Sequence, residues 1–171
     1  MKKSGLILVL LFLMNICASA QIQRNFFDFT LGVTTKKEVS KYFRKNGKKL
    51  YKDKEGINYV NDLRFGGHIW PFAAFSFYNG VLSKVYFADS ENSTERETLD
   101  IVWDTIKKNI SNKYSEYYAP SRSKDDYLIY RDNNTTIQLS YEFSYGSKSL
   151  SIMYIDEYIF NKEYKEGSDE L

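Results

Sequence analysis

The chain has 171 residues, of which 43% are hydrophobic and 17% aromatic, with two prolines and one cysteine. This length and apolar content suit one domain with its own core, and they argue against a disordered chain. The formal charge of +2 comes from Lys2 and Lys3, because the rest of the chain has 22 basic and 22 acidic residues. Net charge therefore gives no reason to expect a nucleic-acid or anionic-membrane partner.

The N-terminal residues have the pattern of a cleaved signal peptide. The two lysines precede an apolar run from Gly5 to Ile16, which is too short to span a bilayer, and Ala18-Ser19-Ala20 supplies small residues for cleavage. We therefore expect residues 1–20 to be removed, the protein to be exported to the periplasm or the extracellular space, and no stable membrane insertion after cleavage.

Cys17 would leave with this segment, so the exported chain would have no disulfide and would depend on its core. Cys17 is not expected to carry a lipid, because Ile16 occupies the position before it, where lipoprotein signals normally have Gly or Ala.

A first helix is expected between Thr34 or Thr35 and Gly47. Thr35 and Glu38 have the spacing of a capping box, and Gly47 suits the left-handed residue after a helix end. The run from Asn25 to Leu31 before this helix is either an edge strand or a hydrophobic lead-in. The many lysines of the helix suit a solvated face, and the alternative is a basic face that binds a partner.

Three strands should follow, at Gly56–Phe65, His68–Tyr78 and Val81–Ala88. Pro71 cannot donate to a ladder, so its strand lies at an edge, is bulged, or starts after the proline. Asn79-Gly80 predicts a tight hairpin. A two-residue type I′ turn would place Phe77 opposite Leu82 and Phe75 opposite Lys84. A three-residue turn would place Phe77 opposite Val81, and we favour it because it makes the apolar face more continuous.

A second helix is expected after Thr94, which forms a capping-box pattern with Glu97. Its apolar residues lie on a single stripe, namely Leu99, Val102, Trp103, Ile106 and Ile110. Tyr114 to Ser123 reads as a loop. Strands are then expected at Tyr127–Arg131, Thr136–Phe143 and Ser149–Ile155, followed by a short helix or an extension at Asp156–Tyr164.

This order predicts an α+β fold of two αβββ units, with an antiparallel sheet and two helices packed on one face. The other face would be free or partly free. We expect a signal peptide at residues 1–20, a single domain at 21–164 with repeat units at about 30–89 and 92–156, and a flexible tail at 165–171.

The string LGVTTKKEVSKYFRKNG, Leu31 to Gly47, resembles the opening of small exported envelope proteins. The repeated helix-plus-strands pattern is similar to β-lactamase-inhibitor-like domains and to outer-membrane assembly lipoproteins of the SmpA/OmlA type. The chain departs from those lipoproteins in lacking an acylated cysteine, so no functional residue carries over. The resemblance implies a non-enzymatic protein-binding role in a bacterial envelope.

The sequence contains few of the residue types on which catalysis usually depends. His68 is the only histidine, and without a cysteine in the exported chain neither a zinc site nor a nucleophile–base pair has its usual residues. We expect no catalytic residue, no metal site and no cofactor, and the chain to be no enzyme. The acidic residues Asp89, Glu91, Glu95 and Glu97, together with Asp125-Asp126, leave a carboxylate-dependent glycan hydrolase as an alternative.

Short motifs add little. Four Asn-x-Ser/Thr patterns match the N-glycosylation sequon, but an Asn-rich chain contains such patterns by chance. Ser168–Leu171 resembles an ER-retention signal, which would have a role only in a eukaryotic host.

The tyrosines of the loop after the second helix are the candidate ligand-binding residues: Tyr114, Tyr117 and Tyr118. Tyrosine is frequent at binding surfaces because it offers a large contact area at low entropic cost. We therefore expect an exported binding module whose partner is another envelope protein, with no nucleic acid bound. The alternatives are a glycan hydrolase or carbohydrate-binding domain, and a structural domain of an envelope assembly.

Overall fold

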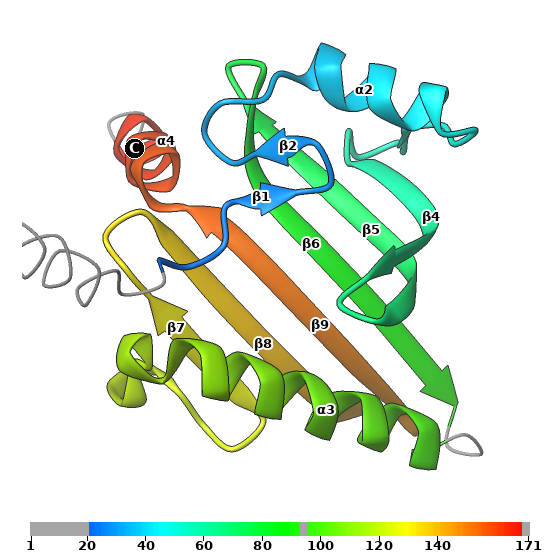
Figure 1. The fold of residues 1–171 in the computed structure, drawn as a ribbon, viewed down its shortest axis with the longest axis vertical. Helices are drawn as coiled ribbons and strands as arrows, with labels where there is room; N and C mark the ends of the chain where they lie inside the picture. Colours follow the sequence, from blue (N-terminus) through cyan, green and yellow to red (C-terminus); the bar gives the residue numbers. More distant parts are fainter. Residues whose placement is uncertain (1–20, 93–95, 169–171) are drawn as a thin grey trace, which may run out of the picture.

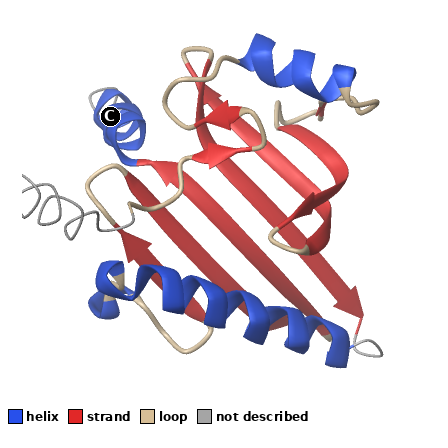
Figure 2. Ribbon diagram, in the orientation of Figure 1, coloured by secondary structure: helices blue, strands red, loops and turns tan. Residues whose placement is uncertain are grey.

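The computed structural model describes residues 21–92 and 96–168 and has a mixed α/β fold. A seven-stranded antiparallel sheet has the strand order β3-β4-β5-β6-β9-β8-β7, and a two-stranded sheet, β1-β2, is separate from it. Three α-helices occur in the described residues (Figures 1 and 2). The prediction of a mixed fold with an antiparallel sheet is confirmed.

The strands and helices have the following bounds: β1 Asn25–Phe26, β2 Phe29–Thr30, α2 Lys36–Lys45, β3 Tyr51–Lys52, β4 Asn58–Phe65, β5 His68–Tyr78, β6 Val81–Asn92, α3 Arg96–Tyr114, β7 Tyr127–Arg131, β8 Thr135–Ser144, β9 Ser147–Asp156 and α4 Glu157–Ser168. Two short 3₁₀ turns, η2 at Ser115–Tyr117 and η3 at Pro120–Arg122, interrupt the predicted loop after α3. Each of the six predicted strands is present.

One face of the large sheet is the core face. Val85 lies opposite Phe75 on β5 and Tyr154 on β9, and Tyr154 lies opposite Ile137 on β8; all four side chains are buried. The elements that cover this face are α2, the β1–β2 hairpin and α3 (Figure 1). The run before α2 is therefore a small hairpin over the core rather than an edge strand of the large sheet.

The C-terminal helix α4 lies against the opposite face, which we call the open face. Its Glu163 pairs with Lys84, and its Glu157 bonds to Thr136, two side chains that alternate with core residues along their strands. No face was predicted for this last helix, and the structure places it on the face opposite α2 and α3 (Figure 1). The helix also runs to Ser168, into the part of the chain predicted to be a flexible tail.

The first helix has the predicted ends. Thr35 is the N-cap and forms a capping box with Glu38, whose carboxylate accepts the backbone N–H of Thr35 at 2.8 Å. Gly47 follows with φ +70°, the left-handed conformation that favours glycine. Val39 and Phe43 are the buried side of α2. The capping box therefore fixes where the chain turns onto the core.

The second helix, α3, buries the predicted stripe. Leu99, Trp103, Ile106 and Ile110 are buried, and Val102 is half-buried. The capping-box prediction at Thr94 and Glu97 lies outside the described residues and side chains. No helix in the described ranges, 21–92 and 96–168, has the length and apolar content needed to cross a membrane.

The β5–β6 hairpin has a two-residue turn, so our preference for a three-residue turn was wrong. Asn79 and Gly80 both have positive φ, and Phe77 lies opposite Leu82. Phe75 nevertheless lies opposite Val85 rather than Lys84, because the register shifts by one residue at Ser83. This bulge puts Leu82 and Val85 on the same buried side, although a regular strand would separate them.

Pro71 occupies an irregular point of an interior strand. β5 pairs with β4 on one side and β6 on the other, so the strand is not at an edge. The β4–β5 ladder pairs Asn61 with Phe72 and Leu63 with Trp70 but leaves out Pro71 and Asp62, and Asp62 has φ +53°. None of the three alternatives is correct: β5 begins before Pro71, and the register is the same on both sides of it, so neither strand has the extra residue of a bulge. The ladder only lacks the pairing of Pro71 with Asp62, because proline has no N–H to donate.

Candidate functional site

The three tyrosines predicted to bind a ligand do not form one surface. Tyr114 is only 2% exposed and its hydroxyl accepts the backbone N–H of Gln23 at 3.2 Å, so it belongs to the core. Tyr117 is half-buried and lines a polar cavity. Tyr118 is 41% exposed, and its ring lies 5.4 Å from that of Tyr130 on β7.

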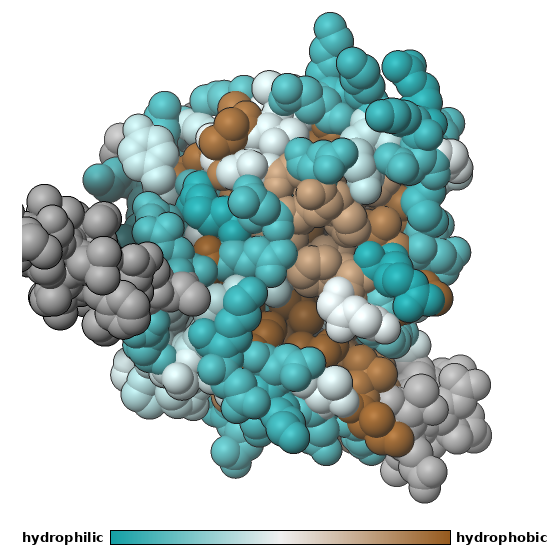
Figure 3. Space-filling model, viewed as in Figure 1, coloured by the Kyte–Doolittle hydropathy of each residue, from teal (hydrophilic) through white to brown (hydrophobic). Residues whose placement is uncertain are grey.

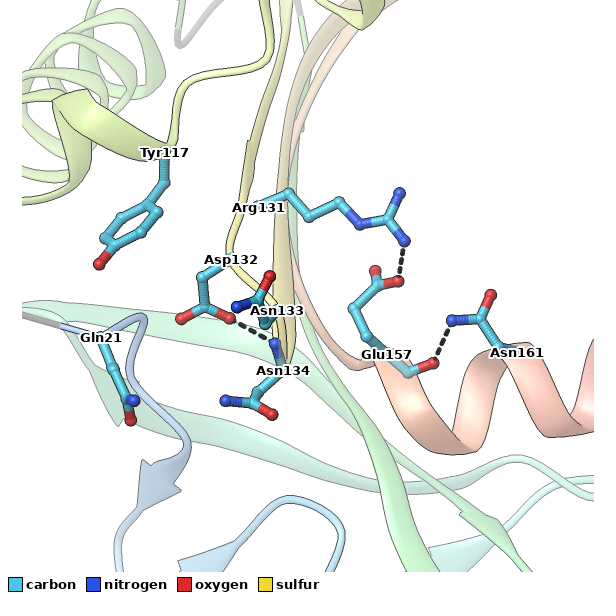
Figure 4. Close-up of a pocket in the computed structure, with 8 residues that line it drawn as sticks. All are labelled: Gln21, Tyr117, Arg131, Asp132, Asn133, Asn134, Glu157 and Asn161. Carbon is cyan, nitrogen blue, oxygen red and sulfur yellow. Dashed lines mark hydrogen bonds and ion pairs between the residues drawn. The ribbon is translucent and has the colours of Figure 1, made fainter.

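The cavity beside Tyr117 has a volume of about 650 Å³ and lies between the β7–β8 turn, the start of α4 and the N-terminal segment (Figure 4). Its lining residues are Gln21, Tyr117, Arg131, Asp132, Asn133, Asn134, Glu157 and Asn161. This is a hydrogen-bonding environment with two carboxylates, Asp132 and Glu157, and a carboxyl pair is the residue set that acid–base catalysis by a glycan hydrolase uses.

Both carboxylates are already bound by the fold. Asp132 accepts the backbone N–H groups of Asn134 and Thr135 at 2.7 Å each, and that of Ile22 at 2.8 Å. Glu157 is buried and accepts hydrogen bonds from Arg131 and Thr136. These bonds hold the turn, the N-terminal segment and α4 together, and they leave few free lone pairs for a substrate.

His68 lies apart from this cavity, on β5. Its Nε2 is 2.8 Å from a carboxylate oxygen of Asp89, and its ring packs edge-on against Trp70. No group of three or more His, Cys, Asp or Glu residues in the described part of the chain has the arrangement of a metal site.

A row of aromatic side chains crosses the open face. The rings of Tyr51 and Tyr59 stack at a centroid distance of 5.5 Å, and those of Tyr59 and Phe72 at 5.4 Å. Tyr86 continues the row, with its ring 6.4 Å from Phe72. We call Tyr51, Tyr59, Phe72 and Tyr86 the aromatic ladder; its members come from β3, β4, β5 and β6.

Cross-strand register explains why the ladder forms. Ala74 lies directly opposite both Tyr59 and Tyr86, and its small side chain leaves space between their rings. Phe72, two residues earlier on the same face, fills that space on a diagonal, within the reach of aromatic side chains. Beside the ladder, a groove of about 380 Å³ has Phe72 and Tyr86 at its wall and serines of β8 and β9 in its lining.

The two rows of the open face that contain the ladder carry no ionisable residue where they continue across the sheet, whereas Asp89 and Glu142 line the adjoining groove. The positions that continue the ladder's rows onto the next strands are Ala74, Ala88, Gln138, Ser140, Ser151 and Met153, and none of them is ionisable. Charged residues make up 27% of the chain, so their absence here is a local property. Depletion of charge together with enrichment of aromatics and methionine is typical of the centre of a protein interface.

The comparisons with known proteins add nothing to this geometry. No protein-family model, no curated protein and no solved structure matches the chain.

Proposed function

We propose that the protein is an exported, non-catalytic binding module whose partner is another protein, bound over the open face. In this proposal the chain consists of two αβββ units, α2 with β4–β6 and α3 with β7–β9, which join at the β6–β9 ladder. Both units place their helix on the core face, so the strands present their other side to a partner. The helix α4 limits that surface at one end.

The aromatic ladder is the observation that carries the proposal. Tyrosine and phenylalanine give the large apolar contact area on which protein interfaces depend, and the tyrosine hydroxyls stay satisfied by water before binding. The four residues lie on four strands, so the sheet holds them rigidly and little entropy is lost when a partner binds.

The same geometry favours a protein over a glycan. An aromatic side chain that binds a sugar needs a free ring face. Both faces of Tyr59 are occupied, one by Tyr51 and the other by Phe72, and Phe72 gives one face to Tyr59. The carboxylates Asp132 and Glu157 are held in structural hydrogen bonds, which speaks against a glycan hydrolase.

Site-specific photo-crosslinking tests the proposal. p-Benzoylphenylalanine replaces Tyr51 or Tyr86 in the ladder or, as a control, Ile101, which is 66% exposed on α3. We expect one adduct of the same size from Tyr51→p-benzoylphenylalanine and Tyr86→p-benzoylphenylalanine in the cells that make the protein, and none from the α3 position. Equal adducts from all three positions, or none from any of them, would contradict the proposal.

A second pair of variants tests whether binding depends on the ladder in particular or on any exposed tyrosine. Tyr59→Ser should reduce the adduct formed from the Tyr51 position at least tenfold, because the ring next to it is lost. Tyr158→Ser removes a tyrosine that is 77% exposed on α4 and should leave the adduct unchanged. Equal effects of the two substitutions would argue against the ladder as the binding surface.

A further inference from the structure

Positive charge is concentrated in one segment of the chain. Residues 36–54 contain nine basic and two acidic side chains, whereas the rest of the chain contains 15 basic and 20 acidic ones. The basic residues are Lys36, Lys37, Lys41, Arg44, Lys45, Lys48, Lys49, Lys52 and Lys54. We call them the basic rim.

The basic rim lies on α2, the loop after it and β3, at one end of the molecule (Figure 1, cyan). All of its side chains are exposed except Lys48, which is half-buried and donates to the carbonyls of Asn61 and Asp62. Figure 3 shows hydrophilic side chains projecting from α2 into solvent.

Few contacts within the described fold engage this charge: Lys48 donates to two carbonyls, and Lys36 and Lys49 lie over the rings of Phe77 and Tyr51. No ion pair in the described residues involves the basic rim. The two acidic residues of the segment bond to local backbone instead: Glu38 to the N–H of Thr35, and Asp53 to the N–H groups of Glu55 and Ile57. Because the packing of α2 depends on Val39 and Phe43, the cations on its outer side are not needed for that packing.

Val33, just before the helix, points to the kind of anion involved. Its side chain is 67% exposed, although neighbouring hydrogen bonds fix its backbone: its own N–H donates to Thr30, and that of Gly32 donates to Leu82 at 2.8 Å. A rigidly presented aliphatic side chain gains nothing from a phosphate backbone or a soluble polyanion. It does gain from entering the interfacial region of a bilayer.

The shape of the surface agrees with a flat partner. No residue between 36 and 54 lines any of the five main cavities of the described chain, and α2 forms an outer edge of the molecule. Basic clusters without a pocket interact with the averaged field of an anionic surface rather than with one bound ion.

We propose that the basic rim, together with Val33, docks the protein on the surface of a bilayer that contains anionic lipids. This docking is peripheral and reversible. The basic rim adjoins the aromatic ladder at Tyr51, whose ring centroid lies 5.4 Å from Lys49 Nζ, so the proposal is tested with lysines of α2 instead.

Vesicle flotation tests this proposal. The full chain is expressed and purified in the processed form that the host releases, and is mixed with vesicles of phosphatidylcholine alone or of equal parts phosphatidylglycerol and phosphatidylcholine. We expect binding to the anionic vesicles only, and its loss at about 1 M salt, where the Debye length falls to about 3 Å. Each cation near an anionic surface contributes about 1 kcal/mol. The triple variant Lys37→Gln/Lys41→Gln/Lys45→Gln should therefore partition on the order of a hundredfold less.

Two controls make the outcome decisive. Lys108→Gln/Lys113→Gln/Lys124→Gln removes the same charge from exposed lysines outside the basic rim and should change partitioning by less than about twofold, because charges far from the membrane are screened. Val33→Ser should weaken vesicle binding about fivefold by removing buried apolar surface, with no effect on binding to a short DNA duplex. Equal losses from both triple variants would overturn the proposal. So would vesicle binding that Val33→Ser leaves unchanged, or binding to the duplex as tight as to the vesicles.

Discussion

Gly32 is the residue at which backbone and packing constrain the sequence most. It has φ +76°, and a Cβ atom added there would lie 2.4 Å from the Asp156 carboxylate and 2.8 Å from the Arg24 guanidinium. Gly47 has a similar φ of +70° but open space around it. The two glycines share one conformational requirement, and only Gly32 has a second, steric one.

We expect Gly32→Ala to lower the free energy of unfolding by about 3 kcal/mol, from left-handed strain plus disruption of a buried ion pair. Gly47→Ala should cost only about 1 kcal/mol, for the strain alone. Urea denaturation of both variants measures the difference. Equal losses would show that the space around Gly32 is not limiting.

The stability of the N-terminal end of α2 depends on pH through the carboxyl group of Glu38. Hydrogen bonds from the backbone and then the hydroxyl of Thr35 lower the pKa of its carboxyl below the ordinary value. A lowered pKa in the folded state means that the carboxylate stabilises the fold at neutral pH, and that this contribution is lost as pH falls through the folded pKa.

Glu38→Gln should therefore reduce stability at pH 7 and make no difference at a pH well below the ordinary glutamate pKa of about 4.3. Denaturation midpoints of the wild type and the variant, measured across that range, should converge on the acid side. A constant gap between the two curves would mean that the charge of Glu38 has no role in the cap.

At the scale of elements, the Ser83 bulge decides which side chains of β6 reach the core. The turn register would put Lys84 opposite Phe75, and the extra residue moves Val85 into that place. Because side chains alternate between the two faces of a strand, one extra residue moves every later side chain of the strand to the opposite face.

Deletion of Ser83 would leave Leu82 and Val85 two residues apart, which keeps both on the core face of a regular ladder. We therefore expect the deletion variant to unfold cooperatively, without increased dye binding to apolar surface. Ser83→Ala keeps the residue count and loses only the bond from the Ser83 hydroxyl to the Ser76 carbonyl, so it should cost about 1 kcal/mol. Loss of cooperative unfolding in the deletion variant would show that the bulge itself is required.

The elements show where sequence reasoning works. The caps of α2, the stripe of α3 and the position of the hairpin at Asn79-Gly80 follow from local rules, although the length of that turn was predicted wrongly. The bulge at Ser83 was not predictable, because a bulge is chosen by which register buries more apolar area across neighbouring strands. The adjacency of Tyr114 and Tyr118 in sequence was misleading for a similar reason: α3 ends at Tyr114, and the 3₁₀ turn that follows redirects the chain.

The aromatic ladder was also beyond local rules. Its members are scattered between residues 51 and 86, and they meet only because three strand pairings hold a common register around Ala74. The expectation of a partly open sheet face came from the alternation of polar and aromatic residues, but no pattern within a single strand identifies the ladder residues.

For the molecule as a whole, a buried ion pair joins the two ends of the domain. Arg24, near the N-terminal edge of the described chain, lies 2.5 Å from Asp156, whose side chain is 3% exposed. Asp156 also accepts the N–H of Ile159 at the start of α4. The pair therefore fixes the N-terminal segment, the last strand and the last helix together.

Arg24→Met should lower the free energy of unfolding by about 3 kcal/mol, because it leaves a buried carboxylate without its charge partner. Lys162→Met, which breaks the exposed pair of Lys162 and Glu166, should cost less than about 0.5 kcal/mol. Chemical denaturation of both variants compares the two sites. Similar small losses would mean that Asp156 is well solvated despite its burial.

Whole-molecule charge illustrates the limit of a composition argument. A balanced count of acidic and basic residues predicts no electrostatic partner, yet the basic rim gathers nine cations into 19 residues of a chain whose other parts are acidic. Net charge is an average, and a partner responds to the local field instead.

The β6–β9 ladder has a consequence for how the chain reaches its structure. It is the central pairing of the large sheet, and it joins Asn92 to Ser147 and Lys84 to Ile155, across more than fifty residues of intervening chain. Hairpins between sequence neighbours form in about 1–10 μs, whereas a pairing of such high contact order is slow. We therefore expect each set of three strands to assemble early, and the step that joins the two sets to limit the folding rate. Until the last strand is made, Val85 and Phe87 have no partner on one side, and the nascent chain presents an unprotected edge.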